Sequence, residues 1–197
     1  MKFGVIIFPG SNCDHDMIYA LETILGQEVE PIWHKQTRLN DYKKEDWIIV
    51  PGGFSYGDYL RSGAIARFSP IMKEVVEFAN NGGHVMGVCN GFQILCEAGL
   101  LPGVLKHNEN QKFICKNVYV KTSTSNTILT QNLDKDLALK IPIAHGEGNF
   151  YIGSEGLSEL KANDQILFQY SDVSGNISDR ANPNGSLENI AGICNKN

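Results

Sequence analysis

The strongest constraint on the fold is an alternation of short apolar runs with helical patterns over the first hundred residues. Apolar runs that end at glycine or proline predict strands, and apolar side chains three or four residues apart predict helices. Strands alternating with helices favour an open, mostly parallel sheet with helices on both faces, which is an α/β fold. The predicted strands are 2–8, 28–33, 47–50 and 84–88, and the predicted helices are 14–25, 70–80 and 91–98.

The pattern changes after Leu100, where helical crossovers become scarce and added antiparallel strands are expected. The segment 171–189 is rich in Ser, Asn, Asp and Gly and predicts a surface loop. No repeat or linker divides the chain, so we predict a single domain over residues 1–197. The strands predicted here are 113–121, 140–144, 165–170 and 190–194, with a short helix at 157–161 and a turn at 195–197.

Charge and cysteine content narrow the classes of protein. The 17 basic and 22 acidic side chains give a net charge of −5, which argues against nucleic acid as a partner. No apolar stretch approaches the length of a membrane span. Pro9-Gly10 ends the apolar run 3–8, which is too short for the hydrophobic region of a signal peptide. The five cysteines form no C-x-x-C pair, so neither a disulfide framework nor a metal site is expected. We therefore expect a cytoplasmic protein with no membrane contact.

Cys89 is the candidate nucleophile, in the sequence Gly87-Val88-Cys89-Asn90-Gly91. This is the pattern of a nucleophile elbow, a tight strand-to-helix turn in which glycines let strand and helix approach each other. The turn presents the side chain at the carboxyl edge of the sheet, and the N-terminus of the following helix favours a thiolate. The alternative is a buried cysteine in an ordinary turn.

Pro51-Gly52-Gly53 follows the third predicted strand and is expected at the same edge of the sheet. Glycines there can turn backbone N–H groups toward a developing oxyanion, and the N–H of Asn90 is the natural second donor. The alternative is a simple tight turn. Together the two features favour nucleophilic catalysis at Cys89.

The other cysteines are weaker candidates. Cys13 also follows a strand and has His15 two positions on, but it lacks flanking glycines. Cys96, Cys115 and Cys194 lie within predicted elements and are expected to be buried.

No histidine is a confident general base. His84 begins the strand that leads to Cys89 and should lie about 16 Å away, at the wrong end of the sheet. His34 and His107 are expected at the surface. His145 follows a strand and precedes a glycine-flanked acid, so it could line the site.

Four sequence blocks together resemble the glutaminase subunits of phosphoribosylformylglycinamidine synthase, the PurQ family of triad (class I) glutamine amidotransferases. The resemblance runs from Met1 to about Asn195 and implies a flavodoxin-like sheet. Two of the blocks are long and more specific to this subunit than the elbow is. The blocks are Phe8–Asp14, Pro51–Arg61, Gly87–Gln93 and Pro142–Gly148.

The resemblance implies that Cys89 attacks the side-chain amide of glutamine, forms a thioester and releases ammonia. An ATP-dependent, PurL-like synthetase subunit would use the ammonia to make formylglycinamidine ribonucleotide in purine biosynthesis, and a small PurS-like bridging subunit is compatible with this. ATP and magnesium are expected on the synthetase, and no cofactor or metal on this chain. The segment Tyr56–Arg61 and the Cys13 loop would shape the site and its contact with the synthetase.

Further roles carry over position by position. Gly53 and Asn90 would donate backbone N–H groups to the oxyanion, and Gln93 would bind the substrate glutamine. The pocket would be bordered by His145, Gly146, Glu147 and Gly148.

The sequence departs from the family pattern in one respect. The family carries its general base and orienting acid in a later Pro-His-Pro-Glu segment, and this sequence ends at Asn197 without one. We expect that the His and Glu of the triad belong to a C-terminal segment lacking here; the alternative is a protein without a working triad. Two other functions stay open: a non-catalytic docking subunit of the same complex, and a DJ-1-like cysteine hydrolase.

Overall fold

The computed structural model describes residues 1–196. It divides into two compact units, Met1–Leu100 and a second unit that starts at Leu101. Each unit is described by itself, and the single domain predicted over residues 1–197 stays a prediction. The predicted turn at 195–197 reaches Asn197, which lies outside the described residues.

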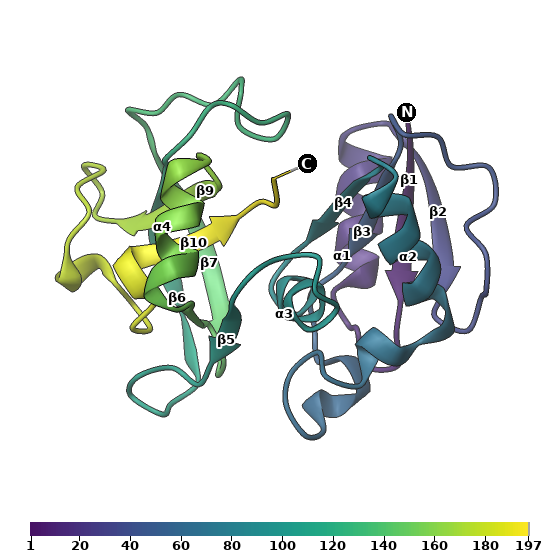
Figure 1. Ribbon diagram of the computed structural model, residues 1–197, viewed down its shortest axis with the longest axis horizontal. Helices are drawn as coiled ribbons and strands as arrows, with labels where there is room; N and C mark the ends of the chain where they lie inside the picture. The colour runs from purple at the N-terminus through teal and green to yellow at the C-terminus, as the bar shows by residue number, and fades with distance from the viewer. Residues whose placement is uncertain (197) are drawn as a thin grey trace. The chain divides into compact units, whose positions relative to one another are not determined.

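The first unit is built on a four-stranded parallel sheet (Figure 1). The strand order is β2-β1-β3-β4, and each neighbouring pair is parallel. All four strands were predicted, two of them with the observed bounds, because short apolar runs closed by turn residues are a strong local signal. The bounds are β1 Lys2–Ile7, β2 Glu28–Trp33, β3 Trp47–Val50 and β4 His84–Gly87.

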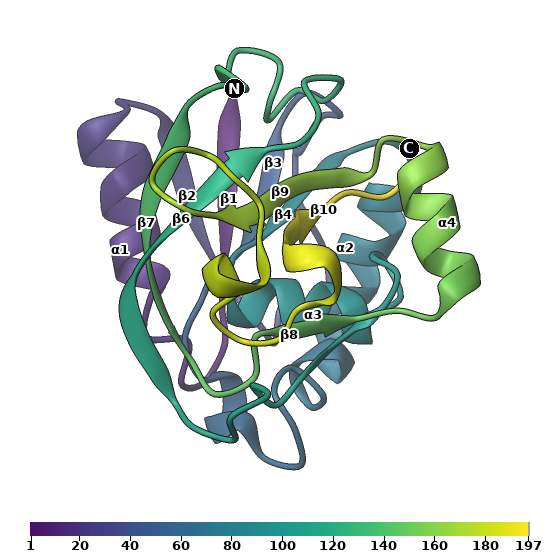
Figure 2. The same ribbon diagram turned by 90° about the vertical axis from the view of Figure 1, so that its left-hand side faces the viewer.

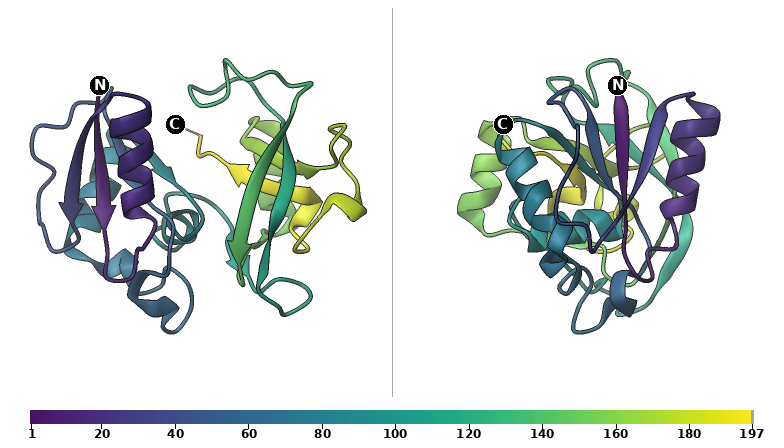
Figure 3. Two further views of the ribbon diagram at one scale, coloured as in Figure 1. Left: turned by 180° about the vertical axis from the view of Figure 1, so that it is seen from behind. Right: turned by 90° about the vertical axis from the view of Figure 1, so that its right-hand side faces the viewer.

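Helices cover both faces of this sheet, as predicted. Helix α2 (Pro70–Asn80) lies in front of the strands in Figure 1, and α1 (Asp14–Tyr19) lies in front of them in the reverse view of Figure 3. A π-helical turn, Ala20–Ile24, extends α1, and α3 (Asn90–Glu97) follows β4. The strand order is that of flavodoxin-like sheets, which bind ligands at the carboxyl ends of their strands.

Both faces of the parallel sheet are buried. On one face Val5, Trp47 and Ile49 pack with Leu21 of the π-helical turn. Residues that alternate with these point to the opposite face, where Ile48 is fully buried. Burial on both faces explains why the strands read as continuous apolar runs.

The second unit contains an antiparallel sheet with the order β10-β9-β6-β7 (Figure 2). Its four long strands correspond to the predicted ones, and the predicted short helix is α4 (Ser154–Ala162). A separate two-stranded ribbon was not predicted, because three-residue strands show no periodicity. The sheet strands are β6 Ile114–Thr122, β7 Ala138–His145, β9 Ile166–Ser171 and β10 Ile190–Ile193; the ribbon is β5 Val104–Lys106 with β8 Asn149–Tyr151.

The loop predicted at 171–189 is more deeply packed than a surface loop. It contains two 3₁₀ turns, and Asn189 is only 5% exposed. The Asn189 Nδ2 group donates to the carbonyl oxygens of Tyr170 at 3.0 Å and Ser178 at 2.9 Å. A polar composition therefore supplies buried hydrogen bonds here, which explains why the predicted surface placement was wrong for this residue.

No helix within residues 1–196 combines the length and the apolar character that crossing a bilayer requires.

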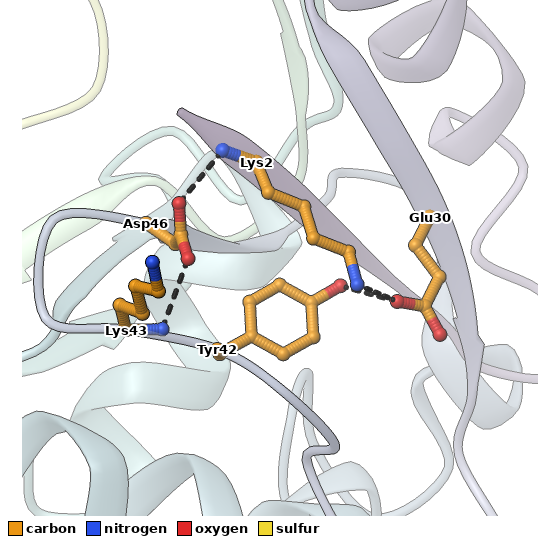
Figure 4. Close-up of polar contacts among 5 residues, drawn as sticks. All are labelled: Lys2, Glu30, Tyr42, Lys43 and Asp46. Carbon is orange, nitrogen blue, oxygen red and sulfur yellow. Dashed lines mark hydrogen bonds and ion pairs between the residues drawn. The ribbon is translucent and has the colours of Figure 1, made fainter.

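A charged cluster ties together the amino end of the parallel sheet (Figure 4). Lys2 Nζ lies 2.6 Å from Glu30 Oε2, and the Tyr42 hydroxyl donates to the same carboxylate at 3.0 Å. The Lys2 hydrogen bond is the main cause that lowers the pKa of Glu30. Asp46 accepts backbone N–H groups of Lys43 at 2.9 Å and Lys2 at 2.8 Å, and these lower its pKa. The cluster fixes β2 and the chain before β3 to β1.

We predict that Glu30→Gln weakens the first unit in a pH-dependent way. Because the pKa of Glu30 is lower in the folded state, its contribution is present above the ordinary carboxyl pKa and is lost as pH falls through the folded value. The side chain is 41% exposed, so solvent screening limits the loss to about 0.5 kcal/mol at pH 7. Urea unfolding followed by the fluorescence of Trp33 and Trp47 measures this unit alone.

The difference between Glu30→Gln and wild type should shrink as pH falls below the ordinary carboxyl pKa of about 4.3. Glu77→Gln, at an exposed position on α2, is the matched control and should leave the free energy of unfolding unchanged. An equal loss at pH 7 and pH 3 would contradict the assigned role of the ion pair.

Candidate active site around Cys89

Cys89 lies in the turn between β4 and α3 with a strained backbone. Its φ is 53° and its ψ is −108°, and it is the N-cap residue of α3. A non-glycine residue in such a region costs about 1–3 kcal/mol, and such residues cluster at functional sites. The strained turn predicted from the sequence is therefore present.

The two flanking glycines are required by close backbone approaches. A Cβ on Gly91 would overlap the carbonyl oxygen of Val50 at the end of β3. A Cβ on Gly87 would lie 2.6 Å from the carbonyl carbon of Gly91. Helix α3 thus starts directly against the sheet, which is the mechanical reason for the spacing of the motif.

The turn after β3 contacts the elbow. A Cβ on Gly52 would lie 3.5 Å from the Cβ of Cys89 and 3.6 Å from the Cβ of Cys13. Gly53 has a φ of +123°, and a Cβ there would lie 2.7 Å from the backbone nitrogen of Asn12. The ends of β1, β3 and β4 therefore meet as expected, while donation of the Gly53 N–H to an oxyanion stays a prediction.

The Asn90 side chain is the central polar group of the site. It is 1% exposed, and its Oδ1 accepts the backbone N–H of Ser55 at 3.1 Å. Its Nδ2 donates to Asp58 Oδ1 at 3.2 Å and to Gln93 Oε1 at 2.9 Å. From the sequence a role is expected only for the Asn90 backbone, and none of its own for Asp58. The sequence signal for a role of the Asn90 side chain was the pair of amides, Asn90 and Gln93, in the first turn of a mainly apolar helix.

The segment after Gly53 is strained and anchored. Tyr56, Asp58 and Leu60 have φ values of 55°, 51° and 73°. The N–H of Tyr56 donates to the carbonyl of Pro9 at 2.6 Å. Arg61 forms a paired ion contact with Glu97, at the end of α3, with both nitrogen–oxygen distances 2.7 Å. The segment is therefore fastened both to the first loop and to α3.

The electrostatics of Cys89 combine opposing effects. The side chain is exposed, yet desolvation by the protein atoms around its sulfur is the main cause that raises the pKa of its thiol, and Cys13 and Asp58 raise it further. The backbone N–H of Asn90 hydrogen-bonds to the sulfur and acts in the opposite direction. The N–H at the helix N-terminus therefore acts in the expected direction, and desolvation together with Cys13 and Asp58 outweighs it.

The remaining cysteines lack the elbow geometry. Cys13 is exposed, but its φ of −100° and ψ of 8° carry no left-handed strain. Cys115 is exposed on β6, so its predicted burial was wrong, because it lies on a strand face that the core does not cover. Cys96 and Cys194 are half-buried.

His84 and His34 of the first unit make structural contacts. His84 stacks on Trp47 at a centroid distance of 4.8 Å, at the start of β4 and far from the elbow, as predicted. His34 is 4% exposed, and its Nδ1 lies 2.8 Å from the Tyr56 hydroxyl. The predicted surface placement of His34 was therefore wrong, because aromatic side chains from neighbouring segments cover it.

In the second unit, the His145–Gly148 segment is ordered around Asn108. The Asn108 Oδ1 accepts from His145 Nδ1 at 3.1 Å and from the Gly148 N–H at 3.1 Å. Burial lowers the pKa of His145, whose ring occupies the space that a Cβ on Gly148 would need. Glu147 lies 3.5 Å from His107, which is exposed as predicted. Whether this segment borders the glutamine pocket stays a prediction.

Across residues 1–196, no three side chains of His, Cys, Asp or Glu come together in a group that could hold a metal ion.

We predict that alkylation of Cys89 by iodoacetamide is slow at pH 7 and accelerates up to a pH above the ordinary thiol pKa of about 8.5. The thiolate is the reacting form, and a raised pKa lowers its fraction at neutral pH. Asp58→Asn removes one of the causes of the raised Cys89 pKa and should move the pH profile of the alkylation rate to lower pH. Peptide mass spectrometry separates Cys89 from the other cysteines, and Asp16→Asn, which neutralises a carboxylate near Cys13, is the control. A profile centred below pH 8 would contradict the electrostatic assignment.

Comparison with known proteins agrees with this geometry. The family model of the CobB/CobQ-like glutamine amidotransferase domain matches residues 1–197. Phosphoribosylformylglycinamidine synthase subunit PurQ of Salinibacter ruber is 52% identical, over 99% of this chain and 82% of that protein. The PurQ subunit of Moorella thermoacetica is 54% identical, over 100% of this chain and 82% of that protein.

A solved structure extends the comparison to three dimensions. The structure of PurLQS from Thermotoga maritima contains a chain that matches with a TM-score of 0.82 and 41% identity. The match covers 99% of this chain and 82% of that one. The strained cysteine elbow, the parallel sheet and the extent of these similarities lead to one conclusion: the chain belongs to the PurQ family of glutamine amidotransferases.

Proposed function

We propose that this chain is the glutaminase subunit of phosphoribosylformylglycinamidine synthase, which hydrolyses glutamine and supplies ammonia for purine biosynthesis. The observation that carries the proposal is the strained Cys89 elbow packed against Gly52, in a chain 52% identical to a PurQ subunit. A carbon–nitrogen ligase that takes nitrogen from glutamine needs such a nucleophile.

The reaction begins at the Cys89 sulfur. The thiolate attacks the side-chain amide carbon of glutamine, and the carbonyl oxygen becomes an oxyanion. In the proposal the N–H groups of Gly53 and Asn90 stabilise that oxyanion. The amide nitrogen then takes a proton and leaves as ammonia, which produces a glutamyl thioester. Water hydrolyses the thioester to glutamate and regenerates Cys89.

The thiol must lose its proton before attack, and its raised pKa lowers the fraction of thiolate at neutral pH. The general base and its orienting acid are the His and Glu that the resemblance implies for the Pro-His-Pro-Glu segment. In the proposal Gln93 holds the substrate glutamine, and the His145–Gly148 segment borders the pocket.

The proposed partners are a PurL-like synthetase subunit and a small PurS-like bridging subunit. The solved PurLQS structure from Thermotoga maritima supports such an assembly. The synthetase would bind ATP and magnesium and consume the ammonia, so this chain itself would need no cofactor. We propose that the complex works in the cytoplasm.

The segment that follows Gly53 is the proposed contact with the synthetase. Tyr59 and Leu60 are 73% and 83% exposed, which is unusual for large apolar side chains that lie next to each other. Two anchors, Asp58 on Asn90 and Arg61 on Glu97, flank this pair and hold it outward. A synthetase docked there would contact the same segment that lines the elbow.

A further prediction concerns Cys89→Ala in the complex of this protein with its synthetase. Glutamine-dependent synthesis should fall by at least about 10³-fold, while ammonia-dependent synthesis is unchanged, because only the source of ammonia is lost. A glutamine-analogue electrophile should label Cys89 in the wild type. Cys13→Ala is the matched control and should retain activity.

The outcomes separate the competing functions. Wild-type complex that uses ammonia but not glutamine would indicate a docking subunit. Hydrolysis of unrelated esters without stimulation by a synthetase would indicate a DJ-1-like hydrolase, and labelling at Cys13 would remove Cys89 from its proposed role.

Another prediction concerns Leu60→Ser at the proposed contact with the synthetase. Loss of this exposed side chain should weaken binding to the synthetase by about tenfold, because an apolar side chain that a partner covers contributes burial free energy that serine does not. Isothermal titration calorimetry measures the dissociation constant. Ile24→Ser removes an apolar side chain, 65% exposed, from the π-helical turn and should leave binding unchanged. Equal effects of both substitutions would rule out a local contact at Leu60.

A further inference from the structure

We propose that the Asn90 side chain is a positioning group, which orients the carboxamide of Gln93 and ties the segment after Gly53 to the elbow. The inference rests on the proposed glutaminase function. It concerns the side chain alone and adds to the role proposed for the Asn90 backbone.

The orientation of the Asn90 amide follows from its neighbours. The backbone N–H of Ser55 can only donate, so the Asn90 atom that faces it at 3.1 Å is the oxygen. The Asp58 carboxylate only accepts, so the atom that faces it at 3.2 Å is the nitrogen. Two independent neighbours therefore fix the same orientation, which amide side chains often leave ambiguous.

This orientation determines that of Gln93. The second hydrogen of Asn90 Nδ2 points to Gln93 at 2.9 Å, so the Gln93 atom on that side must be an acceptor, Oε1. The Gln93 Nε2 group is then the end turned away from Asn90. A substrate group held there is an acceptor, such as a carbonyl or carboxylate oxygen of glutamine. Asn90 thus selects which end of Gln93 the substrate meets.

The same side chain restrains a strained segment. Ser55 and Asp58, both bonded to Asn90, bracket Tyr56 and Gly57, which have φ values of 55° and 65°. Left-handed backbone outside glycine is costly and persists only where surrounding contacts hold it. The segment directly follows Gly53, so its relaxation would shift the proposed oxyanion donor. One buried amide therefore couples the substrate-binding helix turn to the oxyanion loop.

Asn90→Asp tests this with little change in volume. It keeps an oxygen for the Ser55 N–H and keeps the backbone N–H of residue 90. It removes the donor to Gln93 and places a second carboxylate against Asp58. Asn90→Asp combined with Asp58→Asn keeps the wild-type net charge but still leaves Gln93 without a donor. Asn90→Ala, which adds no charge, is the second single variant.

The experiment compares glutaminase kinetics of the synthetase complex with alkylation of Cys89 by iodoacetamide, a small reagent that does not need glutamine recognition. All three variants should raise KM for glutamine by about tenfold and lower kcat/KM by about 10- to 100-fold. The alkylation rate of the charge-neutral double variant and of Asn90→Ala should stay within about threefold of the wild type.

Asn189→Asp is the matched control for stability. Its Nδ2 also makes two hydrogen bonds in the second unit, a buried one to Tyr170 and a partly buried one to Ser178. It should lower the unfolding temperature about as much as Asn90→Asp does, with KM unchanged.

Several results would overturn the inference. One is a wild-type KM in a folded Asn90→Asp or Asn90→Ala complex. Another is recovery of KM in the double variant, which would assign the effect to charge. A third is a loss of alkylation and glutaminase rates in proportion to a lowered unfolding temperature, which would indicate a structural role only. A wild-type complex without glutaminase activity would instead refute the proposed function.

Discussion

The close approach of Gly91 to the end of β3 is the constraint on which the site depends. With no side chain at that position, α3 can begin against the Val50 carbonyl rather than one turn farther out. That contact forces the residue before the helix into left-handed backbone, and this residue is Cys89. It also brings the first helical turn, with its exposed N–H groups and amide side chains, to the edge where the strands end. The strained backbone of Cys89 is thus a consequence of how tightly a helix packs on a sheet.

Much of this arrangement could be predicted from the sequence, because its causes are local. The strands 28–33 and 47–50 and the helix 70–80 have the predicted bounds, since apolar periodicity and flanking turn residues specify them. The elbow could be predicted because glycines two residues before and two residues after a cysteine are typical of a tight strand-to-helix turn. The resemblance of four blocks to one family added the chemistry that periodicity does not contain.

The rest depended on residues far apart in the chain. Asp58 raises the pKa of Cys89, and Tyr56 helps to bury His34, only because the segment after Gly53 folds back over the strand ends. No local sequence pattern predicts such contacts. The same is true of the Asn90 side chain, whose role depends on Ser55, 35 residues away. Local sequence therefore indicated where the nucleophile lies, and tertiary structure determined its electrostatics and its support.

The charged cluster at the amino end of the parallel sheet has a consequence for engineering. Lys2, Glu30 and Tyr42 join the strands at the edge opposite the one that carries Cys89. Polar cross-linking thus lies near the starts of β1 and β2, and the strained backbone of Cys89 follows the end of β4. Designers who need a more robust variant can optimise the partly exposed ion pair of the amino end while leaving the elbow untouched. The two ends of the sheet differ in tolerance, because a side chain on Gly91 would overlap the backbone of β3.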